Sequence, residues 1–157
     1  MAPNLIVQAI ENFDDGFLFE RLCNDIMHLH YPNFKPGGHV HDLGIDGLLE
    51  FEDDSNVRLY FKESTVHSQK YIFQYSIQKT WESKIKDTLK KIKKNEIEAD
   101  KLIYVTNLNP TTTAVTRLQV YALKEYGLSI EIHHQEFLRV YLEDPDHSYL
   151  VENYFAS

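Results

Sequence analysis

The fold class of this chain is decided by residues 70–107, KYIFQYSIQKTWESKIKDTLKKIKKNEIEADKLIYVTN. The first part, 70–78, is rich in aromatic and β-branched side chains and predicts a strand. Thr80 then stands where a helix N-cap belongs, and 81–95 carries apolar side chains at helical spacing. The run 101–107 is almost entirely apolar, which is typical of a strand buried on both faces. This order predicts two parallel strands joined by a right-handed crossover.

The sequence after this stretch continues the alternation of helices and strands. Asn109 and Pro110 resemble an N-cap followed by proline at the first helical position. We therefore expect a helix from there to Tyr126, ended by Gly127. Three further segments are expected after it: a strand at 128–134, a short helix at 135–142 and a partly helical tail beyond Pro145.

The sequence before this stretch predicts a helix and a hairpin. Apolar side chains recur at helical spacing over 14–30, and Pro32 closes that segment. The other expected segments are a loop at 32–44, a strand at 45–51, a turn at 52–56, a strand at 57–61 and a polar loop at 62–70. The two strands would pair as a hairpin. We expect strand 45–51 to neighbour strand 70–78.

Together these segments predict an α/β sandwich around a central mixed β-sheet. The 157 residues suffice for one core. We place the core domain at 13–142, with a lead-in at 1–12 and a C-terminal tail at 143–157. Apolar residues make up 43% of the chain and charged residues 25%, which excludes the disordered and collagen-like classes.

Charge and hydropathy limit the cellular locations and the binding partners that we expect for this protein. No stretch approaches the ~20 apolar residues of a membrane span, and no secretory signal is visible, so we expect a cytoplasmic protein without a membrane partner. The net charge of −8 opposes bulk electrostatic binding to DNA. Residues 79–94 are the exception, with seven lysines against two acids. They form either a solvated helix face or a patch that follows DNA phosphates, and we expect Lys86, Lys90 and Lys94 to contact DNA.

Several common catalytic motifs are absent from the sequence. It contains no GxxxxGK[ST], GxGxxG, GxSxG or HExxH pattern. The single cysteine, Cys23, lies in the first predicted helix, where a buried core position explains it better than a nucleophile. The close histidine pairs are His28 and His30, His39 and His41, and His133 and His134. Zinc needs three or four ligands, so packing or surface roles explain these pairs better than a zinc site.

Three residues with oxygen-bearing side chains form the strongest candidate site. Glu20 lies on the first helix, Asp46 stands at the start of a strand, and Gln74 is in the middle of another strand. Hard oxygen ligands on rigid elements suit Mg²⁺, and Asp46 and Gln74 would share one edge of a cleft. The simpler alternative is that Asp46 caps a turn, Glu20 is solvated and Gln74 pairs with backbone.

Four short motifs accompany these residues in a fixed order. They are FERL at 19–22, GIDG at 44–47, FQYS at 73–76 and LIYVTN at 102–107. Over 13–142 this order resembles the PD-(D/E)XK restriction-endonuclease-like superfamily, and most of all the Mrr-type restriction endonucleases. The resemblance implies a three-layer sandwich with a central mixed β-sheet. It also implies hydrolysis of DNA phosphodiester bonds with Mg²⁺ or Mn²⁺ held by Glu20, Asp46 and Gln74.

One departure from the family pattern concerns the lysine that helps activate the attacking water. The pattern places it two residues after Gln74, where this chain has Ser76. Lys84 borders the apolar face of the following helix and is the best replacement; Lys79 is second and Lys62 a distant third. The literal E-x-K at 82–84 falls in the first helical turn, where the helix dipole explains its glutamate.

The resemblance favours a Mg²⁺-dependent DNA endonuclease, the effector domain of a bacterial restriction or anti-phage defence system. Asp46, Gln74 and Glu20 would bind the metal, and Lys84 or Lys79 would orient the water. We expect a fused or associated sensor or NTPase module and a homo-oligomer as partners. The competing interpretation is a catalytically inactive nuclease-fold module for DNA binding or assembly, because Ser76 replaces the lysine.

Overall fold

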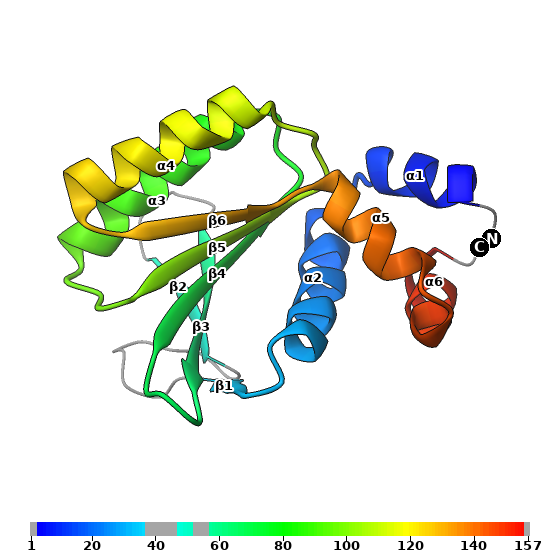
Figure 1. The fold of residues 1–157 in the computed structure, drawn as a ribbon, viewed down its shortest axis with the longest axis horizontal. Coiled ribbons are helices and arrows are strands. Elements are labelled where there is room, and N and C mark those ends of the chain that lie inside the picture. Colours follow the sequence, from blue (N-terminus) through cyan, green and yellow to red (C-terminus); the bar gives the residue numbers. More distant parts are fainter. Residues whose placement is uncertain (1–2, 37–46, 52–56, 156–157) are drawn as a thin grey trace.

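The centre of the structure is a mixed β-sheet with helices on both faces (Figure 1). This computed structural model describes residues 3–36, 47–51 and 57–155. The helices are α1 (Pro3–Glu11), α2 (Gly16–His30), α3 (Trp81–Lys94), α4 (Thr112–Tyr126), α5 (Gln135–Glu143) and α6 (Ser148–Phe155), with a 3-10 turn, η2, at Pro145–His147. The strands are β1 (Phe34–Pro36), β2 (Leu48–Glu50), β3 (Arg58–Ser64), β4 (Lys70–Ser76), β5 (Lys101–Thr106) and β6 (Ser129–His133). The predicted α/β sandwich around a mixed sheet is confirmed.

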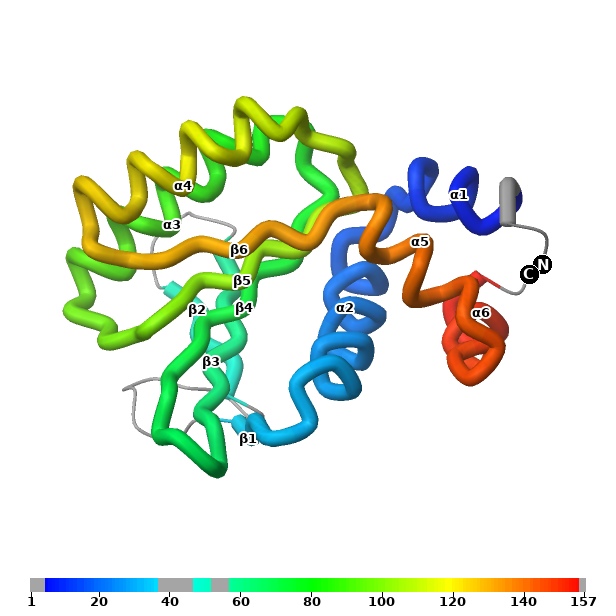
Figure 2. The backbone as a smooth tube through the Cα atoms, viewed as in Figure 1, coloured from blue at the N-terminus to red at the C-terminus, as the bar shows by residue number. Residues whose placement is uncertain are grey.

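The sheet combines an antiparallel meander with two parallel crossovers. Its strand order is β1-β3-β4-β5-β6, and β2 pairs with β3 beside this path. β3 is antiparallel to β1, β2 and β4, whereas β4, β5 and β6 run parallel. Figure 2 shows the crossover helices α3 and α4 together on one face and α2 on the other. The parallel arrangement predicted from 70–107 is therefore confirmed.

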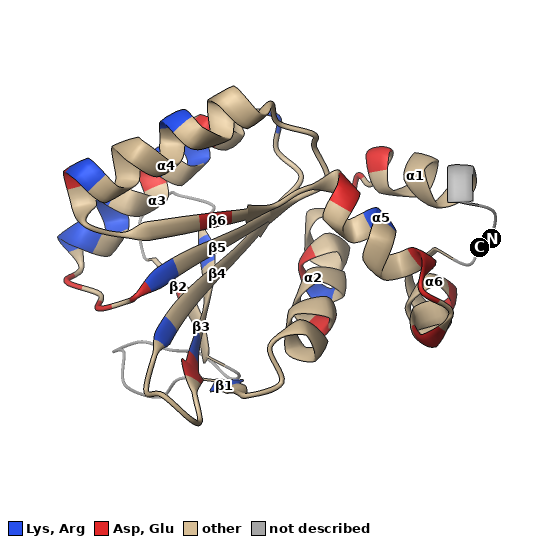
Figure 3. Ribbon diagram, in the orientation of Figure 1, with Lys and Arg blue, Asp and Glu red and all other residues tan. Residues whose placement is uncertain are grey.

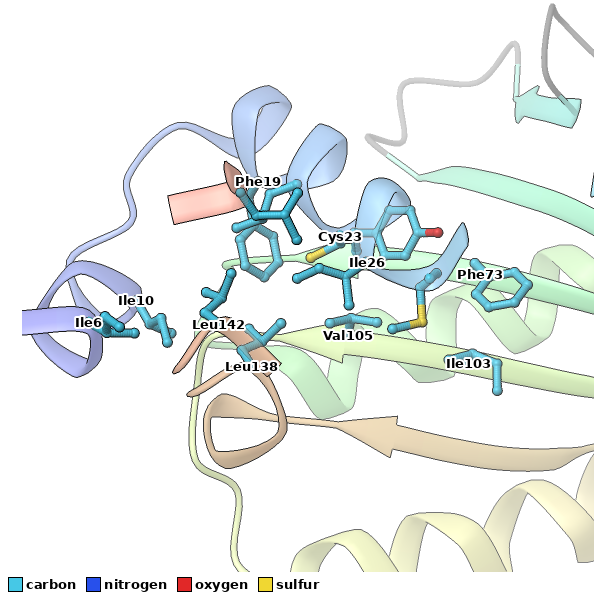
Figure 4. Packing of buried hydrophobic residues seen from close by; sticks show 14 residues of the cluster. Ile6, Ile10, Phe19, Cys23, Ile26, Phe73, Ile103, Val105, Leu138 and Leu142 are labelled. Carbon is cyan, nitrogen blue, oxygen red and sulfur yellow. The ribbon is translucent and has the colours of Figure 1, made fainter. Parts of the chain in front are cut away.

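Alternation along the strands divides the buried apolar residues into two cores. In β4, Phe73 and Tyr75 face α2 and pack with Cys23 and Ile26 (Figure 4). Ile72, directly before Phe73, packs on the opposite face with α3 and α4. Successive strand side chains point to opposite faces, so the direction of every β4 side chain follows from these contacts.

Local sequence signals explain where several elements begin and end. Asp15 caps α2, since its carboxylate accepts from the Leu18 backbone N–H at 3.0 Å. Gly127 ends α4 in the left-handed conformation, with φ of 63°, which glycine adopts without a Cβ penalty. β5 is buried along almost its whole length, as its apolar run predicted.

Two predicted boundaries are wrong. The N-cap of α4 is Thr111 instead of Asn109, because the Thr111 hydroxyl accepts from the Ala114 backbone N–H at 3.1 Å. Residues 62–64 belong to β3 and not to a polar loop. Pairing on both sides of β3, with β1 and with β4, extends this strand through Lys62 to Ser64.

The predicted contact between strand 45–51 and strand 70–78 is also wrong. β2 does pair with β3 in the expected hairpin, in register Leu48 to Tyr60. β3 then pairs with β4 on its other side, in register Tyr60 to Phe73. The meander thus places β3 between β2 and β4, at a strand spacing of about 4.8 Å on each side.

The two ends of the described chain form helices that pack together. The lead-in 1–12, to which the sequence assigned no structure, contains α1, whose Ile6 and Ile10 pack against Leu138 and Leu142 of α5. The tail contains η2 and α6, and Leu150 of α6 joins the same core. Among the described helices, none is long and apolar enough to cross a bilayer.

Candidate active site

An open cavity of about 530 Å³ lies at the carboxyl end of β4. The first turns of α2 and α3 border it, together with the end of β2 and the start of β3. Its charged lining residues are Glu20, Glu50, Arg58 and Lys84. This cavity therefore collects ionisable side chains from four elements that are far apart along the chain.

Glu20 and Arg58 form the buried ion pair of this cavity. Glu20 lies in the second turn of α2 and is only 7% exposed. The Arg58 Nε donates to its carboxylate at 3.2 Å, and the Arg58 guanidinium also bonds Glu50. Burial raises the pKa of Glu20, whereas the charge and hydrogen bond of Arg58 act in the opposite direction. Glu20 is thus a carboxylate partly desolvated and held in place by one guanidinium.

Lys84 supplies the second cation of the cavity. It lies in the first turns of α3 and is half-buried, and its charge acts on Glu20. Desolvation lowers the pKa of Lys84, and the negative charges of Glu20 and Asp87 oppose this effect. Lys79 is exposed and does not line the cavity. The order of preference expected from the helix face agrees with this placement, while the catalytic roles of both lysines stay predictions.

Ser76 also lines the cavity, at the end of β4. Its hydroxyl accepts from the Gln78 backbone N–H at 3.1 Å and so shapes the exit from the strand. The position at which the family pattern has lysine therefore borders the same space as Glu20 and Lys84.

Gln74 lies elsewhere. Its side chain shares the α3-facing side of β4 with Ile72, whereas Glu20 is on α2, across the sheet. Gln74 is 1% exposed, and neither atom of its amide has a hydrogen-bond partner among the described residues. Gln74 is not among the residues that line the cavity with Glu20, and its role as a metal ligand stays a prediction.

The third expected metal ligand, Asp46, lies outside the described residues. Within the described part of the chain, no group of three or more His, Cys, Asp or Glu side chains could hold a metal ion. The cavity supplies two carboxylates, Glu20 and Glu50, and Arg58 binds both. These residues alone do not complete a divalent-cation site, so such a site would need a ligand from outside the described residues, and Asp46 as that ligand stays a prediction.

Lys62 is a buried cation to which the sequence analysis gave little weight. It lies on β3, on the side that faces α2, and is 4% exposed; among the described lysines it is the buried one. Its Nζ lies 5.1 Å from the centroid of the Phe73 ring. Desolvation lowers the pKa of Lys62 to about 8, opposed by the charge of Asp25. The polar residues after Phe61 predicted a loop, whereas Lys62 belongs to β3 and is buried there.

A second cavity of about 540 Å³ adjoins the first along α3. The two share Val57, Gln78 and Lys84 in their linings. The second is lined by three lysines against one aspartate, namely Lys84, Lys86, Lys90 and Asp87. We call this surface the lysine groove. Figure 3 shows basic residues along α3 and acidic residues on α6, which lies on the other side of the molecule.

The lysine groove contains two of the three lysines expected to contact DNA. Lys86 and Lys90 line it, and the Lys86 Nζ lies 5.0 Å from the centroid of the Tyr121 ring. Lys94, at the last turn of α3, is exposed but is not part of the lining. Contact with DNA stays a prediction for all three.

His30, His133 and Cys23 have packing roles. The rings of His30 and His133 lie 5.6 Å apart, and His133 stacks on Phe137. Burial lowers the pKa of His133 to about 4. Cys23 is fully buried, and burial raises the pKa of its thiol. His39 and His41 lie outside the described residues.

The layers, the strand order and the crossovers define a restriction-endonuclease-like fold. Among solved structures, the chain is similar to MspJI restriction endonuclease in complex with a 27-mer oligonucleotide, with a TM-score of 0.51 and 13% sequence identity. The match covers 99% of this chain and 36% of the MspJI chain, so the described fold corresponds to about a third of that protein. No protein-family model and no curated protein sequence matches the chain.

Proposed function

We propose that this chain is a DNA endonuclease domain that hydrolyses phosphodiester bonds, of the Mrr type within the PD-(D/E)XK superfamily. One observation carries the proposal: Glu20 and Lys84 line one open cavity that adjoins the lysine groove. The similar fold of MspJI, a restriction endonuclease whose structure holds an oligonucleotide, supports it. We further propose a role as an effector in bacterial restriction or anti-phage defence.

The side chains of the cavity suit the charges of the reaction. Phosphates would lie along Lys86 and Lys90, with the scissile phosphate at Lys84. A phosphodiester transition state gathers negative charge on its non-bridging oxygens, and the Lys84 ammonium would stabilise this charge. The Glu20 carboxylate, with a raised pKa, would orient the attacking water and accept its proton.

Dependence on Mg²⁺ or Mn²⁺ is part of the proposal and rests on the resemblance. A bound divalent cation would polarise the phosphate and lower the pKa of its water. Glu20 and Asp46 are the ligands that we propose, and Gln74 is not among them because it does not line the cavity. Glu20 would exchange Arg58 for the metal, so Arg58 holds the carboxylate in place until then.

Target recognition would come from other chains or domains. We propose a fused or associated sensor or NTPase module, and a homo-oligomer that brings two such cavities to one DNA. The net charge of −8 supports this arrangement, since an isolated domain with this charge would hold DNA weakly.

A second candidate function is a catalytically inactive module that keeps the fold for DNA binding or assembly. It is favoured by the pairing of both cavity carboxylates, Glu20 and Glu50, with Arg58. Ser76 in place of the family lysine favours it too. Such a module would keep the lysine groove and lack cleavage.

Nicking of supercoiled plasmid with Mg²⁺ or Mn²⁺ separates the two functions. We expect nicking by the wild type, loss of nicking with Glu20→Gln or Asp46→Asn, and no loss with Glu152→Gln, an exposed carboxylate on α6. DNA binding in a mobility-shift assay without nicking by the wild type would establish the inactive module. Neither nicking nor binding would overturn both functions.

A further inference from the structure

An exposed aromatic side chain stands at the mouth of the Glu20 cavity. Phe17 lies in the first turn of α2, lines the cavity and is 67% exposed. A large apolar ring that is exposed to solvent at the edge of a cavity indicates a binding surface. The Arg58 guanidinium carbon lies 5.2 Å from the centroid of the Phe17 ring, so a cation–π contact joins this ring to the ion pair of Arg58 with Glu20.

Other aromatic and apolar groups continue this surface inside the cavity. Phe51 and Tyr75 also line it, and the Tyr75 hydroxyl donates to Asn24 at 3.0 Å, which fixes the ring. The cavity volume of about 530 Å³ lies in the range of small-molecule sites, about 300–1,000 Å³. A single nucleotide belongs to this size class.

The adjoining lysine groove indicates the path along which an extended ligand would reach the cavity. Because the two cavities share Val57, Gln78 and Lys84, a chain of phosphates along Lys90 and Lys86 would lead to the Phe17 mouth. A basic track beside exposed aromatic rings is the combination that binds single strands: cations follow the backbone and aromatic faces stack the bases.

We infer that the cavity takes an unpaired nucleotide of single-stranded DNA, with its base stacked on Phe17 and its neighbouring phosphates on Lys86 and Lys90. This inference rests on the proposed function and names its substrate class as single-stranded or locally unpaired DNA. Arg58 acts here as a positioning residue, because it holds the Phe17 ring at the mouth.

Fluorescence anisotropy in EDTA tests the inference without cleavage. The probes are a labelled 15-mer of deoxythymidine and a labelled blunt-ended duplex of 15 base pairs, which has no unpaired loop. Both are measured at the same fixed salt concentration, because affinity depends on it. We expect wild type to bind the single strand at least tenfold more tightly than the duplex. Phe17→Ala should weaken single-strand binding about tenfold, and Phe17→Tyr should retain it because the stacking face remains.

Val120→Ala is the matched control, since Val120 is also an exposed apolar residue, 59% exposed on α4, away from the cavity. It should bind both probes like wild type. Equal affinity for single strand and duplex, or an unchanged affinity in Phe17→Ala, would overturn the inference. Conversion of a dimer into a monomer by Phe17→Ala in size-exclusion chromatography would also overturn it, since Phe17 would then contact a second copy of this chain.

Different experimental results would contradict this inference and the proposed function. Plasmid nicking by the wild type without any single-strand preference keeps the nuclease and rejects the stacked nucleotide. A single-strand preference that requires Phe17, without nicking in either metal, keeps the stacked nucleotide and rejects the nuclease. Circular dichroism of Phe17→Ala should match wild type because the side chain is exposed.

Discussion

The guanidinium of Arg58 on β3 is bound to the carboxylate of Glu20 on α2, with 3.2 Å between nitrogen and oxygen. The pair joins the sheet to the helix that covers it, at the edge of the cavity. Its carboxylate is largely desolvated while its guanidinium is partly open to solvent. The pair therefore joins α2 to the sheet, and its carboxylate is also a candidate reactive group. Changes of pH and mutations of Glu20 can distinguish these two roles.

The pH dependence of stability should report on Glu20. Its pKa is raised from the ordinary value of 4.5, mainly by burial. A carboxyl with a raised pKa in the folded state binds more protons when folded, so it stabilises the fold at low pH and loses that contribution as pH rises. In Glu20→Gln this loss is absent. Relative to wild type, the free energy of unfolding of the variant should therefore increase as the pH rises above the ordinary value of 4.5.

Urea unfolding at several pH values measures this difference. Glu50→Gln is the control, since Glu50 bonds the same guanidinium but is exposed. A difference between Glu20→Gln and wild type that does not vary with pH would mean that burial does not dominate at Glu20.

Lys84 should matter for rate and little for folding. Removal of one preorganised group that stabilises transition-state charge typically costs about 10²–10³ in rate. We expect a loss of this size in plasmid nicking by Lys84→Ala, and little beyond a lower DNA affinity in Lys90→Ala and Lys94→Ala. If Lys79→Ala loses activity and Lys84→Ala does not, the cation comes from the end of β4.

Ser76→Lys tests whether the cavity accepts the family's lysine position. Because Ser76 lines the cavity, a lysine there can place its ammonium near Glu20. In a Lys84→Ala background we expect Ser76→Lys to recover about tenfold or more of the nicking rate, a part of the factor lost. Ser76→Met in the same background has a similar length without the charge and should recover none. Recovery by both would point to packing as the cause.

Lys62 should lower the stability of the fold at neutral pH. Its pKa falls from 10.5 to about 8 in the folded protein, mainly because it is desolvated. Between these values the unfolded chain binds more protons, so stability rises with pH across this window. Lys62→Met should therefore unfold at higher urea concentration at pH 7, with a gain of about 3 kcal/mol that shrinks toward pH 10.

The same variant tests a catalytic role for Lys62. Loss of nicking in Lys62→Met, with normal nicking in Lys84→Ala, would make Lys62 the cation of the site. Normal nicking in Lys62→Met would leave Lys62 as a buried residue over the Phe73 ring.

Gln74 should prove unfavourable for stability and unnecessary for cleavage. Its buried amide has no hydrogen-bond partner among the described residues, and a buried polar group without a partner costs about 1–3 kcal/mol. Gln74→Met conserves the side-chain volume and removes this cost, so its free energy of unfolding should rise by about that amount. Its nicking rate should equal that of wild type. A loss of nicking with intact folding would return Gln74 to the site.

The features predicted correctly from the sequence are mainly those that depend on residues close together along the chain. The spacing over 70–107 was enough for a strand, a helix and a parallel strand, because alternation and helical periodicity are local. The pairing of β3 between β2 and β4 was not predictable in this way, since it depends on contacts between separate segments. The motif around Gln74 likewise does not show that its amide is buried and lies outside the cavity lining, because burial depends on packing between separate segments.

The same distinction between local patterns and contacts of separate segments applies to the residues of the candidate site. Helical geometry alone placed Lys84 nearest to the site among the α3 lysines, and the structure has it beside Glu20. Arg58 and Phe17 were missed because their importance arises only where α2 meets β3. A strand prediction for 57–64 with alternating faces would have grouped Arg58 with Lys62 on the side facing α2.

The docking of α1 has a consequence for the order in which the protein is made and folded. Asn107 donates to the backbone carbonyl of Ile10 at 3.0 Å, across 97 positions of sequence, and α5 covers Ile6 and Ile10 from still farther along the chain. Synthesis runs from the N-terminus, so α1 emerges before every element it packs against. These two isoleucines stay uncovered until α5 has left the ribosome. Of the described helices, α1 is therefore made first and buried among the last.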